Sequence, residues 1–404
     1  MLSNGQNSDE HKSVRIFSYL SFILVGIVNT FLGPILPFLT EKWTINDTQA
    51  GYFLAAQSLG GMGGTIASSF LFSRLSSRLI LLIGFAIIAL SLLGISSNVW
   101  EIGFVSSLFS GVAIGLIIPT TTLIVSQTAK ENRAAVINIL NFFWAFGAIL
   151  SPLLFFNLDS KTRLNFLLIA LTLACAIFFA ILVKRRNASF NLKTLNSPTN
   201  RKPETRNQKP LLKWTGKLYL LGSAWLFATT IFLQIGVEAS LGGWLATYSK
   251  RLTVSDWWLL VPALYWTGFL LSRVVSTFYL RRFSEKSLIL NGLSLVIFGQ
   301  ILIISASEIN LAAVGATLVG FGTAPIFPTV IAIVSTKFEN KAPELISYMF
   351  LLAGLSGMIF SWLIGFTASA SGNLKNALFI PLSCSVILFA LHFFTRKTVS
   401  TERQ

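Results

Sequence analysis

Residues 111–126 read GVAIGLIIPTTTLIVS, and residues 320–335 read GFGTAPIFPTVIAIVS. The two segments share Gly, Pro-Thr and Ile-Val-Ser at the same positions, 209 residues apart and without insertion. Both lie inside apolar stretches long enough to cross a membrane. A repeated membrane unit of this kind is typical of proteins built from two related halves of helices.

The 209-residue offset extends through both halves of the chain. It pairs Gly33 with Gly242, and it pairs the only two cysteines, Cys175 with Cys384. The register therefore holds from the first apolar stretch to the last one of each half. We expect a duplicated architecture along the whole chain.

The composition requires lipid as the solvent. Of 404 residues, 53% are hydrophobic and 11% are charged, and the mean hydropathy is +0.71. About 20 helical residues cross a hydrocarbon core of roughly 30 Å. The sequence contains twelve stretches of about that length: 15–39, 50–72, 79–97, 101–126, 135–157, 163–183, 217–247, 257–280, 287–306, 309–335, 344–368 and 375–395.

These stretches are continuously apolar and do not alternate with polar residues, which favours helices over a membrane β-barrel. The predicted fold is an all-α integral membrane protein, with twelve transmembrane helices in two pseudo-symmetric halves of six. The predicted units are an N-terminal bundle over 1–184, a basic cytoplasmic linker over 185–216 and a C-terminal bundle over 217–404. The linker is rich in Lys, Arg, Asn, Pro, Ser and Thr, which is typical of a flexible connection.

The net charge of +16 is explained by membrane topology. If both termini are cytoplasmic, the outer loops hold only six of the 31 Lys and Arg residues, as the positive-inside rule requires. We therefore expect a multi-pass protein of the inner (plasma) membrane, with no cleaved signal peptide. The basic residues are scattered over short loops, so nucleic acid is not an expected partner.

The sequence offers few residues that could form a catalytic site. The two histidines, His11 and His392, lie near opposite ends, and neither cysteine has a His or an acid nearby. No nucleotide-binding or phosphate-binding motif is present. We expect no enzyme activity, no metal site and no cofactor other than a coupling ion, H⁺ or Na⁺.

Glu238 is the one carboxylate deep within a predicted span, and the repeat pairs it with Asn29. Counted from Lys217, it is placed in the outer half of a long helix, and Gly236, Gly242 and Gly243 leave open whether that helix is continuous. Removal from water favours the protonated form of a carboxyl group, so Glu238 is a candidate proton carrier. The alternatives are a charged acceptor for solute hydroxyls, or a structural residue that hydrogen-bonds a neighbouring helix.

Other polar and aromatic residues inside the spans are candidates for solute contact. Amides suit the hydroxyls of a neutral polyhydroxylated ligand, and aromatic faces suit its ring. A membrane Trp or Tyr is also commonly a packing or interfacial residue. The predicted binding residues are Asn29, Gln57, Asn141, Trp144, Gln234, Glu238, Tyr265, Trp266 and Gln300.

Arg273 is the second charge within a span. Its position in the helix is nearer the cytoplasm than that of Glu238, by about 10 Å at 1.5 Å per residue. A direct ion pair between the two is therefore not expected. We expect Arg273 to act at a gate or as a loop anchor.

Three phrases of the second half, 237–244, 268–284 and 320–329, resemble the major facilitator superfamily and, within it, the branch of fucose permease-like sugar transporters. The twelve spans in two halves joined by a basic loop resemble the superfamily across essentially the whole chain, and the resemblance to the branch rests on the three phrases. It implies a rocker-switch transporter with a central site, importing a sugar with H⁺ or Na⁺.

Two departures from the family's pattern stand out. The loop after the second span has serines in place of the family's Gly and Asp, leaving Arg74 and Arg78 as gate candidates with an incomplete charge relay. The first and fourth spans lack the acids that this branch carries. Proton coupling would then have to move to Glu238, and an uncoupled facilitator is the alternative.

The sequence thus predicts a secondary active transporter of a small polar solute, preferentially a neutral sugar, that works as a monomer by alternating access. Two alternatives remain open. One is an exporter of drugs or amphipathic compounds, and the other is a lipid or lysolipid flippase.

Overall fold

The computed structural model describes residues 2–128, 133–156, 161–184, 222–253, 255–338 and 341–395. The predicted linker, 185–216, lies outside these ranges. By their internal contacts the residues divide into two units. Unit 1 comprises Met1–Thr44 and Phe53–Gly216, and unit 2 comprises Ile45–Tyr52 and Lys217–Gln404.

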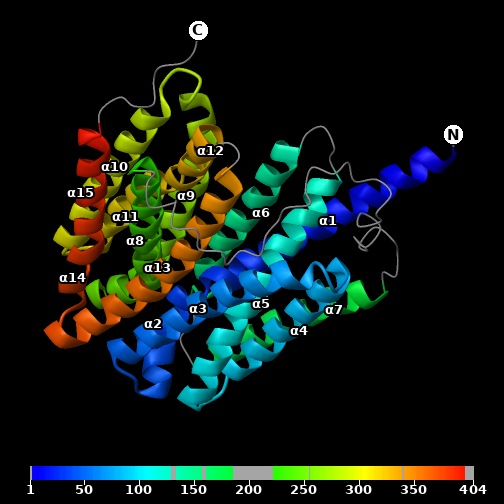
Figure 1. The fold of residues 1–404 in the computed structure, drawn as a ribbon. Coiled ribbons are helices and arrows are strands. Elements are labelled where there is room, and N and C mark those ends of the chain that lie inside the picture. Colours follow the sequence, from blue (N-terminus) through cyan, green and yellow to red (C-terminus); the bar gives the residue numbers. More distant parts are fainter. Residues whose placement is uncertain are drawn as a thin grey trace, which may run out of the picture. The chain divides into compact units, whose positions relative to one another are not determined.

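Every described element is helical (Figure 1). The first seven are α1 (Leu2–Thr30), α2 (Leu32–Trp43), α3 (Asp47–Leu71), α4 (Ser77–Ile95), α5 (Trp100–Gln127), α6 (Arg133–Leu154) and α7 (Lys161–Lys184). The others are α8 (Gly222–Leu252), the 3₁₀ helix η5 (Asp256–Leu259), α9 (Leu260–Tyr279), α10 (Glu285–Ser305), α11 (Ile309–Thr323), α12 (Ile326–Phe338), α13 (Ala342–Ser371), α14 (Leu374–Ala377) and α15 (Phe379–Phe394).

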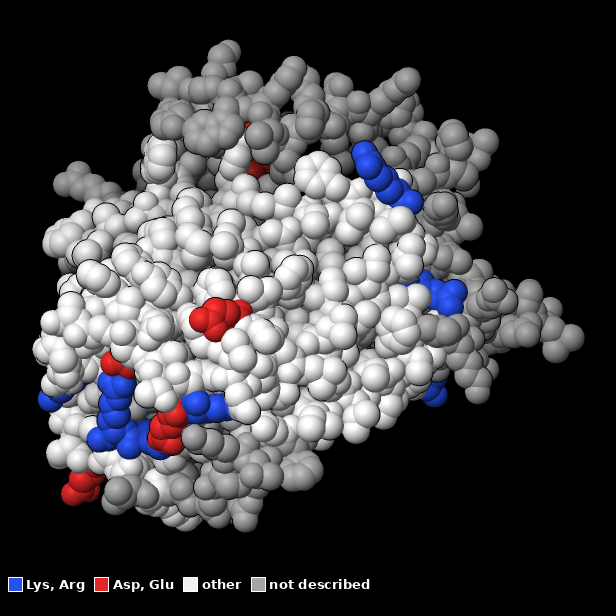
Figure 2. Space-filling model, turned by 90° about the horizontal axis from the view of Figure 1, so that it is seen from below, with Lys and Arg blue, Asp and Glu red and all other residues white. Residues whose placement is uncertain are grey.

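Each of the twelve predicted spans is largely helical over its described residues, which leave out 157 and 217–221. In the described part of the chain, ten segments are long and apolar enough to cross a membrane. The helices α3 and α7 complete the twelve, α3 being rich in Gly and Ser, and α7 having its apolar core only over Leu167–Leu182. On the face drawn in Figure 2, Lys, Arg, Asp and Glu cover little of the described surface. The chain is a multi-pass membrane protein with six spans in each half.

Two predicted spans are interrupted. The span 15–39 breaks at Phe31, between α1 and α2. The span 309–335 breaks at Ala324–Pro325, between α11 and α12, because proline has no N–H to continue the helix. The last predicted span, 375–395, begins with the single turn of α14.

Within each unit, glycines bring neighbouring helices into backbone contact. In unit 1, a Cβ added to Gly60 or Gly64 of α3 would overlap the carbonyl oxygen of Leu108 or of Val112 on α5. The Gly60–Gly64 and Gly111–Gly115 spacings are typical of such close packing. In unit 2, α9 packs on α11 in the same way, because Gly320 lies against the backbone of Tyr265.

Unit 2 contains a large apolar cluster. It joins α8, α10, α12, α13 and α15, and its members include Phe227, Ile231, Leu293, Val330 and Leu388. Figure 1 shows α8 running beside α13, and these two helices are in extensive contact. The cluster fixes α8, which carries the strongest functional candidates of the sequence.

Candidate functional site

Glu238 lies at the middle of α8, sixteen residues after Gly222 and fourteen before Leu252. Its predicted position in the outer half of the span stays a prediction, since residues 217–221, from which that position was counted, lie outside the described ranges. The neighbouring glycines do not break α8. They make room for aromatic rings instead: a Cβ on Gly236 would lie 2.5 Å from the Phe360 ring.

The Glu238 carboxylate is half-buried and accepts no hydrogen bond from another described residue. A structural glutamate that ties α8 to a neighbouring helix would show such a bond. The group is therefore held in the middle of a span without a fixed polar partner.

Gln234, one helical turn before Glu238, faces the break between α11 and α12. Its Nε2 donates to the main-chain oxygen of Thr323, the last residue of α11, at 3.4 Å. The side chain is fully buried, and its Oε1 has no hydrogen-bond partner among the described residues. Helix breaks at membrane depth, where backbone groups face a polar site, are a recurrent feature of transporter binding sites.

Tyr265 on α9 completes this set of groups. Its hydroxyl is fully buried beside the Thr323 hydroxyl and interacts electrostatically with Glu238. It makes no hydrogen bond of normal geometry within the described part of the chain. The Tyr265 ring packs edge-on against Trp266, with 5.0 Å between the ring centroids. We call Gln234, Glu238, Tyr265 and Thr323 the polar cluster.

Arg273 lies next to the polar cluster on α9. Its guanidinium stacks on the Phe269 ring at 4.9 Å, and its charge interacts electrostatically with that of Glu238. The two form no ion pair, and the buried Nε of Arg273 has no hydrogen-bond partner among the residues described. The arginine thus influences Glu238 at a distance and does not bind it.

Gln300 is not brought to the polar cluster by any contact of the described residues. Its Nε2 donates to the Ser385 hydroxyl at 3.2 Å, which joins α10 to α15. Its Oε1 is buried and, like that of Gln234, has no hydrogen-bond partner among the described residues, so the predicted binding role of Gln300 stays a prediction. Thr323 is the residue that sequence reasoning missed, although its position before Pro325 in the 320–329 phrase carries the signal.

Unit 1 holds the remaining predicted binding residues. Asn29 is half-buried on α1, two residues before the break at Phe31. Gln57 of α3 lies beside it, with its Nε2 donating to the Val28 carbonyl at 3.4 Å. Asn141 and Trp144 are half-buried on α6, and the Trp144 backbone packs against Gly26 of α1. Gln57 thus contacts the α1 backbone next to Asn29, near the break at Phe31.

The two predicted gate arginines differ in their surroundings. Arg74 is exposed after α3, whereas the Nε of Arg78 donates to the Leu182 carbonyl at 2.8 Å. Arg78 therefore anchors the start of α4 to the end of α7. Among the described residues, no group of three His, Cys, Asp or Glu side chains could hold a metal ion.

Comparison with known proteins identifies the family. The model of the Major Facilitator Superfamily matches residues 18–361. The glucose/mannose transporter GlcP of Bacillus subtilis (strain 168) is 22% identical over 403 residues, which cover 97% of this chain and 96% of that protein. A TsgA homolog of Buchnera aphidicola subsp. Baizongia pistaciae (strain Bp) is 22% identical, with 93% of this chain and 92% of that protein covered.

Solved structures share the fold at lower sequence identity. A D-xylose-proton symporter superposes with a TM-score of 0.75 at 14% identity, covering 95% of this chain and 97% of that one. The nucleoside transporter NupG superposes with a TM-score of 0.71 at 14% identity, covering 95% and 98%.

Proposed function

Because the chain belongs to the major facilitator superfamily and is a membrane transporter, we propose that its solute is a small neutral polyhydroxylated molecule, preferentially a sugar. The observation that carries this proposal is the polar cluster. Two of its fully buried members, Gln234 and Tyr265, each keep a polar atom without a regular hydrogen-bond partner in the described chain. Such atoms are costly unless a ligand or water satisfies them.

The chemistry of the cluster matches hydroxyl groups. The Gln234 amide oxygen accepts a hydroxyl proton, the Tyr265 hydroxyl can donate or accept, and the Glu238 carboxylate accepts. Buried Trp266 offers an aromatic face next to Tyr265. The similarity to a glucose/mannose transporter along almost the whole chain supports the same class of solute.

We assign the coupling role to Glu238. A carboxyl group in the middle of a span, with no hydrogen-bond partner in the described residues, can gain and lose a proton as the surroundings change. A sodium ion coordinated by the carboxylate and nearby oxygens is the alternative coupling ion. Asn29, Gln57, Asn141 and Trp144 remain proposed solute contacts from unit 1, and the cytoplasmic placement of both termini remains a prediction.

Thermal unfolding of the purified protein with a panel of monosaccharides tests the class of solute. A ligand present at about 100 times its Kd stabilises the native state by about 2.7 kcal/mol. We expect a sugar to raise the melting temperature of the native protein and to have at least tenfold lower affinity for Gln234→Ala. The control Asn291→Ala, at an exposed amide on α10, should respond as the native protein does.

An amphipathic cation and a lysophospholipid belong in the same panel. Stabilisation by either of them, with none by any sugar, would replace the proposal with a drug exporter or a lipid flippase. Stabilisation by a sugar that Gln234→Ala leaves unchanged would move the solute site away from the polar cluster.

A further inference from the structure

The helix α8 carries a line of polar side chains that extends beyond the polar cluster. Thr230, Gln234 and Glu238 follow one another at intervals of four residues, so they lie along one face of the helix. At 1.5 Å per residue the line is about 12 Å long. Thr230 and Gln234 are fully buried. Polar side chains buried at membrane depth commonly have a functional role.

The side chain of His392 meets this line at Thr230. Its Nε2 lies 2.9 Å from the Thr230 hydroxyl oxygen, and the residue is 5% exposed, in the last turn of α15. The neighbouring residues Ile231 of α8 and Leu388 of α15 belong to the large apolar cluster of unit 2. An imidazole and a hydroxyl group cost more to bury there than apolar side chains of the same size would.

The Thr230 hydroxyl has two acceptors within reach. It donates to the Leu226 carbonyl at 2.7 Å, and it can donate to the His392 Nε2 when the imidazole carries its proton on Nδ1. When the imidazole proton is on Nε2, the Thr230 oxygen accepts it. A hydroxyl group that can turn between two partners can receive a proton on one side and give its own proton to the other.

Gln234 occupies the position between Thr230 and Glu238. Its Oε1 is buried and has no hydrogen-bond partner among the described residues, so it can hold a water molecule on the line. An amide orients water but does not itself carry the proton, so water completes the connection between the carboxyl group and the hydroxyl group. The ionisable groups that act on Glu238 are Arg273 and Tyr265, both on α9.

Cationic side chains surround the other end of the line. The charge of Lys286 on α10 interacts electrostatically with His392, and the Lys286 Nζ donates to the Thr395 main-chain oxygen at 2.6 Å. Lys337 of α12 lies over the Phe227 ring of α8, 5.9 Å from its centroid. Because like charges repel, a protonated His392 beside Lys286 does not trap its proton and passes it on.

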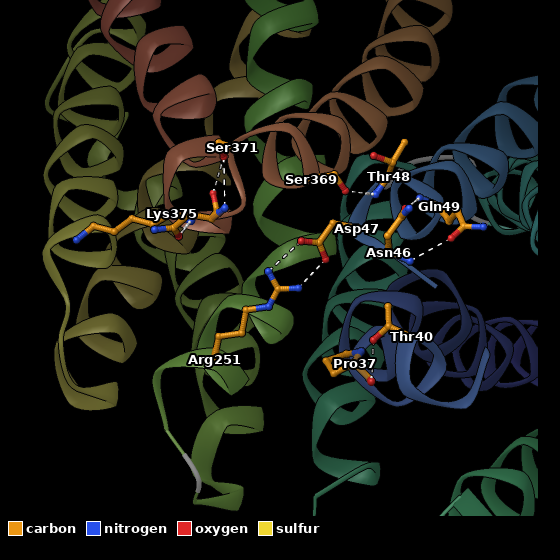
Figure 3. Close-up of polar contacts among 11 residues, drawn as sticks. Pro37, Thr40, Asn46, Asp47, Thr48, Gln49, Arg251, Ser369, Ser371 and Lys375 are labelled. Atoms are coloured by element: carbon orange, nitrogen blue, oxygen red, sulfur yellow. Dashed lines mark hydrogen bonds and ion pairs between the residues drawn. The ribbon is translucent and has the colours of Figure 1, made fainter. Parts of the chain in front are cut away.

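The line leads away from the end of α8 that carries its basic residues (Figure 3). Arg251, in the last turn of α8, binds the Asp47 carboxylate through hydrogen bonds of 3.0 and 2.5 Å. Thr230 and His392 lie on the opposite side of Glu238, toward the start of α8. In the predicted topology this start is the cytoplasmic end of the helix.

We propose that Thr230 and His392 form a proton path from Glu238 to the end of unit 2 that is predicted to be cytoplasmic. The Glu238 O–H bond breaks, and water carries the proton to the Thr230 oxygen. The Thr230 hydroxyl gives its own proton to the His392 Nε2, and the imidazolium releases its Nδ1 proton to water. One proton moves and no electron is transferred, and exchange with water returns the imidazole to its first tautomer. The path rests on the coupling role proposed for Glu238.

Infrared spectroscopy after a jump to alkaline pH tests the proton path without any solute. The protein is placed in lipid nanodiscs, and the carbonyl band of protonated Glu238 is identified by its absence from Glu238→Gln. We expect this band to decay at least tenfold more slowly in His392→Gln and in Thr230→Val than in the native protein. The change His392→Gln keeps an amide donor but removes the titratable group.

Two controls separate proton transfer from packing. Thr230→Ser keeps the hydroxyl group and should decay at the native rate. Thr317→Val should do the same, because the Thr317 hydroxyl donates within α11, to the Ala313 carbonyl at 2.8 Å. Imidazole added to His392→Ala should restore the native rate. Failure of this rescue in a variant with the native melting temperature would overturn the proton path.

The same experiment distinguishes the path from the coupling role on which it rests. Native decay rates in both His392→Gln and Thr230→Val would overturn the proton path and leave the coupling role of Glu238 intact. A carbonyl signal that is identical in the native protein and in Glu238→Gln would overturn the coupling role, and the proton path with it.

Discussion

Gln234 on α8 and Thr323 at the end of α11 meet through one hydrogen bond, from the Gln234 Nε2 to the Thr323 main-chain oxygen. The bond is long, at 3.4 Å, and leaves the buried Gln234 Oε1 unused by the described residues. The helix α11 ends at Thr323, just before Pro325. The Thr323 carbonyl at this helix end therefore faces the Gln234 amide of α8.

Replacing Gln234 by Ala removes one solute contact and one weak bond. A typical hydrogen bond contributes about 0.5–1.5 kcal/mol, so we expect solute affinity to fall by about tenfold and the free energy of unfolding to change by less than about 1 kcal/mol. Equilibrium binding and thermal unfolding measure the two effects. A large loss of stability with unchanged affinity would assign Gln234 to packing.

The change Tyr265→Phe should weaken binding without destabilising the protein. The Tyr265 hydroxyl makes no regular hydrogen bond in the described chain, so its removal leaves no new buried group unpaired. Tyr248→Phe is the matched control, because the Tyr248 hydroxyl donates to the Ile303 carbonyl at 2.9 Å. The control should lose about 1 kcal/mol of stability and keep its affinity. The reverse pattern would place the solute near Tyr248.

Gly60 and Gly63 on α3 offer a paired test of the packing. A Cβ at Gly60 would overlap the Leu108 carbonyl, whereas Gly63 has no atom within 4 Å of that position. We expect Gly60→Ala to destabilise the protein by about 1–3 kcal/mol through overpacking. Gly63→Ala should be neutral or stabilising by up to about 1 kcal/mol, because Ala favours helices. Equal melting temperatures for the two variants would contradict the packing of α3 on α5.

Ser385→Ala tests whether Gln300 has a structural role. Loss of the Ser385 hydroxyl leaves the buried Gln300 Nε2 without its acceptor, at a cost of about 1–3 kcal/mol. Solute affinity should change by less than twofold. A tenfold change in affinity with native stability would return Gln300 to the solute site.

Much of the fold is predictable because lipid imposes one simple rule on the chain: each span needs about 20 apolar helical residues. All twelve spans follow from that rule, and the close packing of Gly60 and Gly111 follows from their small-residue spacing. The positions of the breaks do not. Gly236 and Gly242 leave α8 continuous, and Pro119 lies inside the continuous α5, whereas α11 ends just before Pro325 and α1 ends at Thr30 without a proline.

The candidate site was predictable only in part. Glu238 and Gln234 stand out because polar side chains inside a membrane span are costly to bury and commonly have a functional role. The hydrogen-bond partners of buried polar groups come from segments that are distant in the chain. The sequence pattern alone does not show which of these segments will be in contact. Gln300 and Gln234 look alike in sequence, yet one binds Ser385 on α15 and the other faces the end of α11.

The most direct test of the account is uptake of the stabilising sugar into proteoliposomes under an inward proton gradient, with native protein and Glu238→Gln compared. Glu308→Gln is the control at an exposed carboxylate. We predict accumulation by the native protein and by the control, no gradient-driven accumulation by Glu238→Gln, and exchange between equilibrated sugar pools in all three. Accumulation by Glu238→Gln at the native rate would contradict the assignment of Glu238 as the coupling carboxylate.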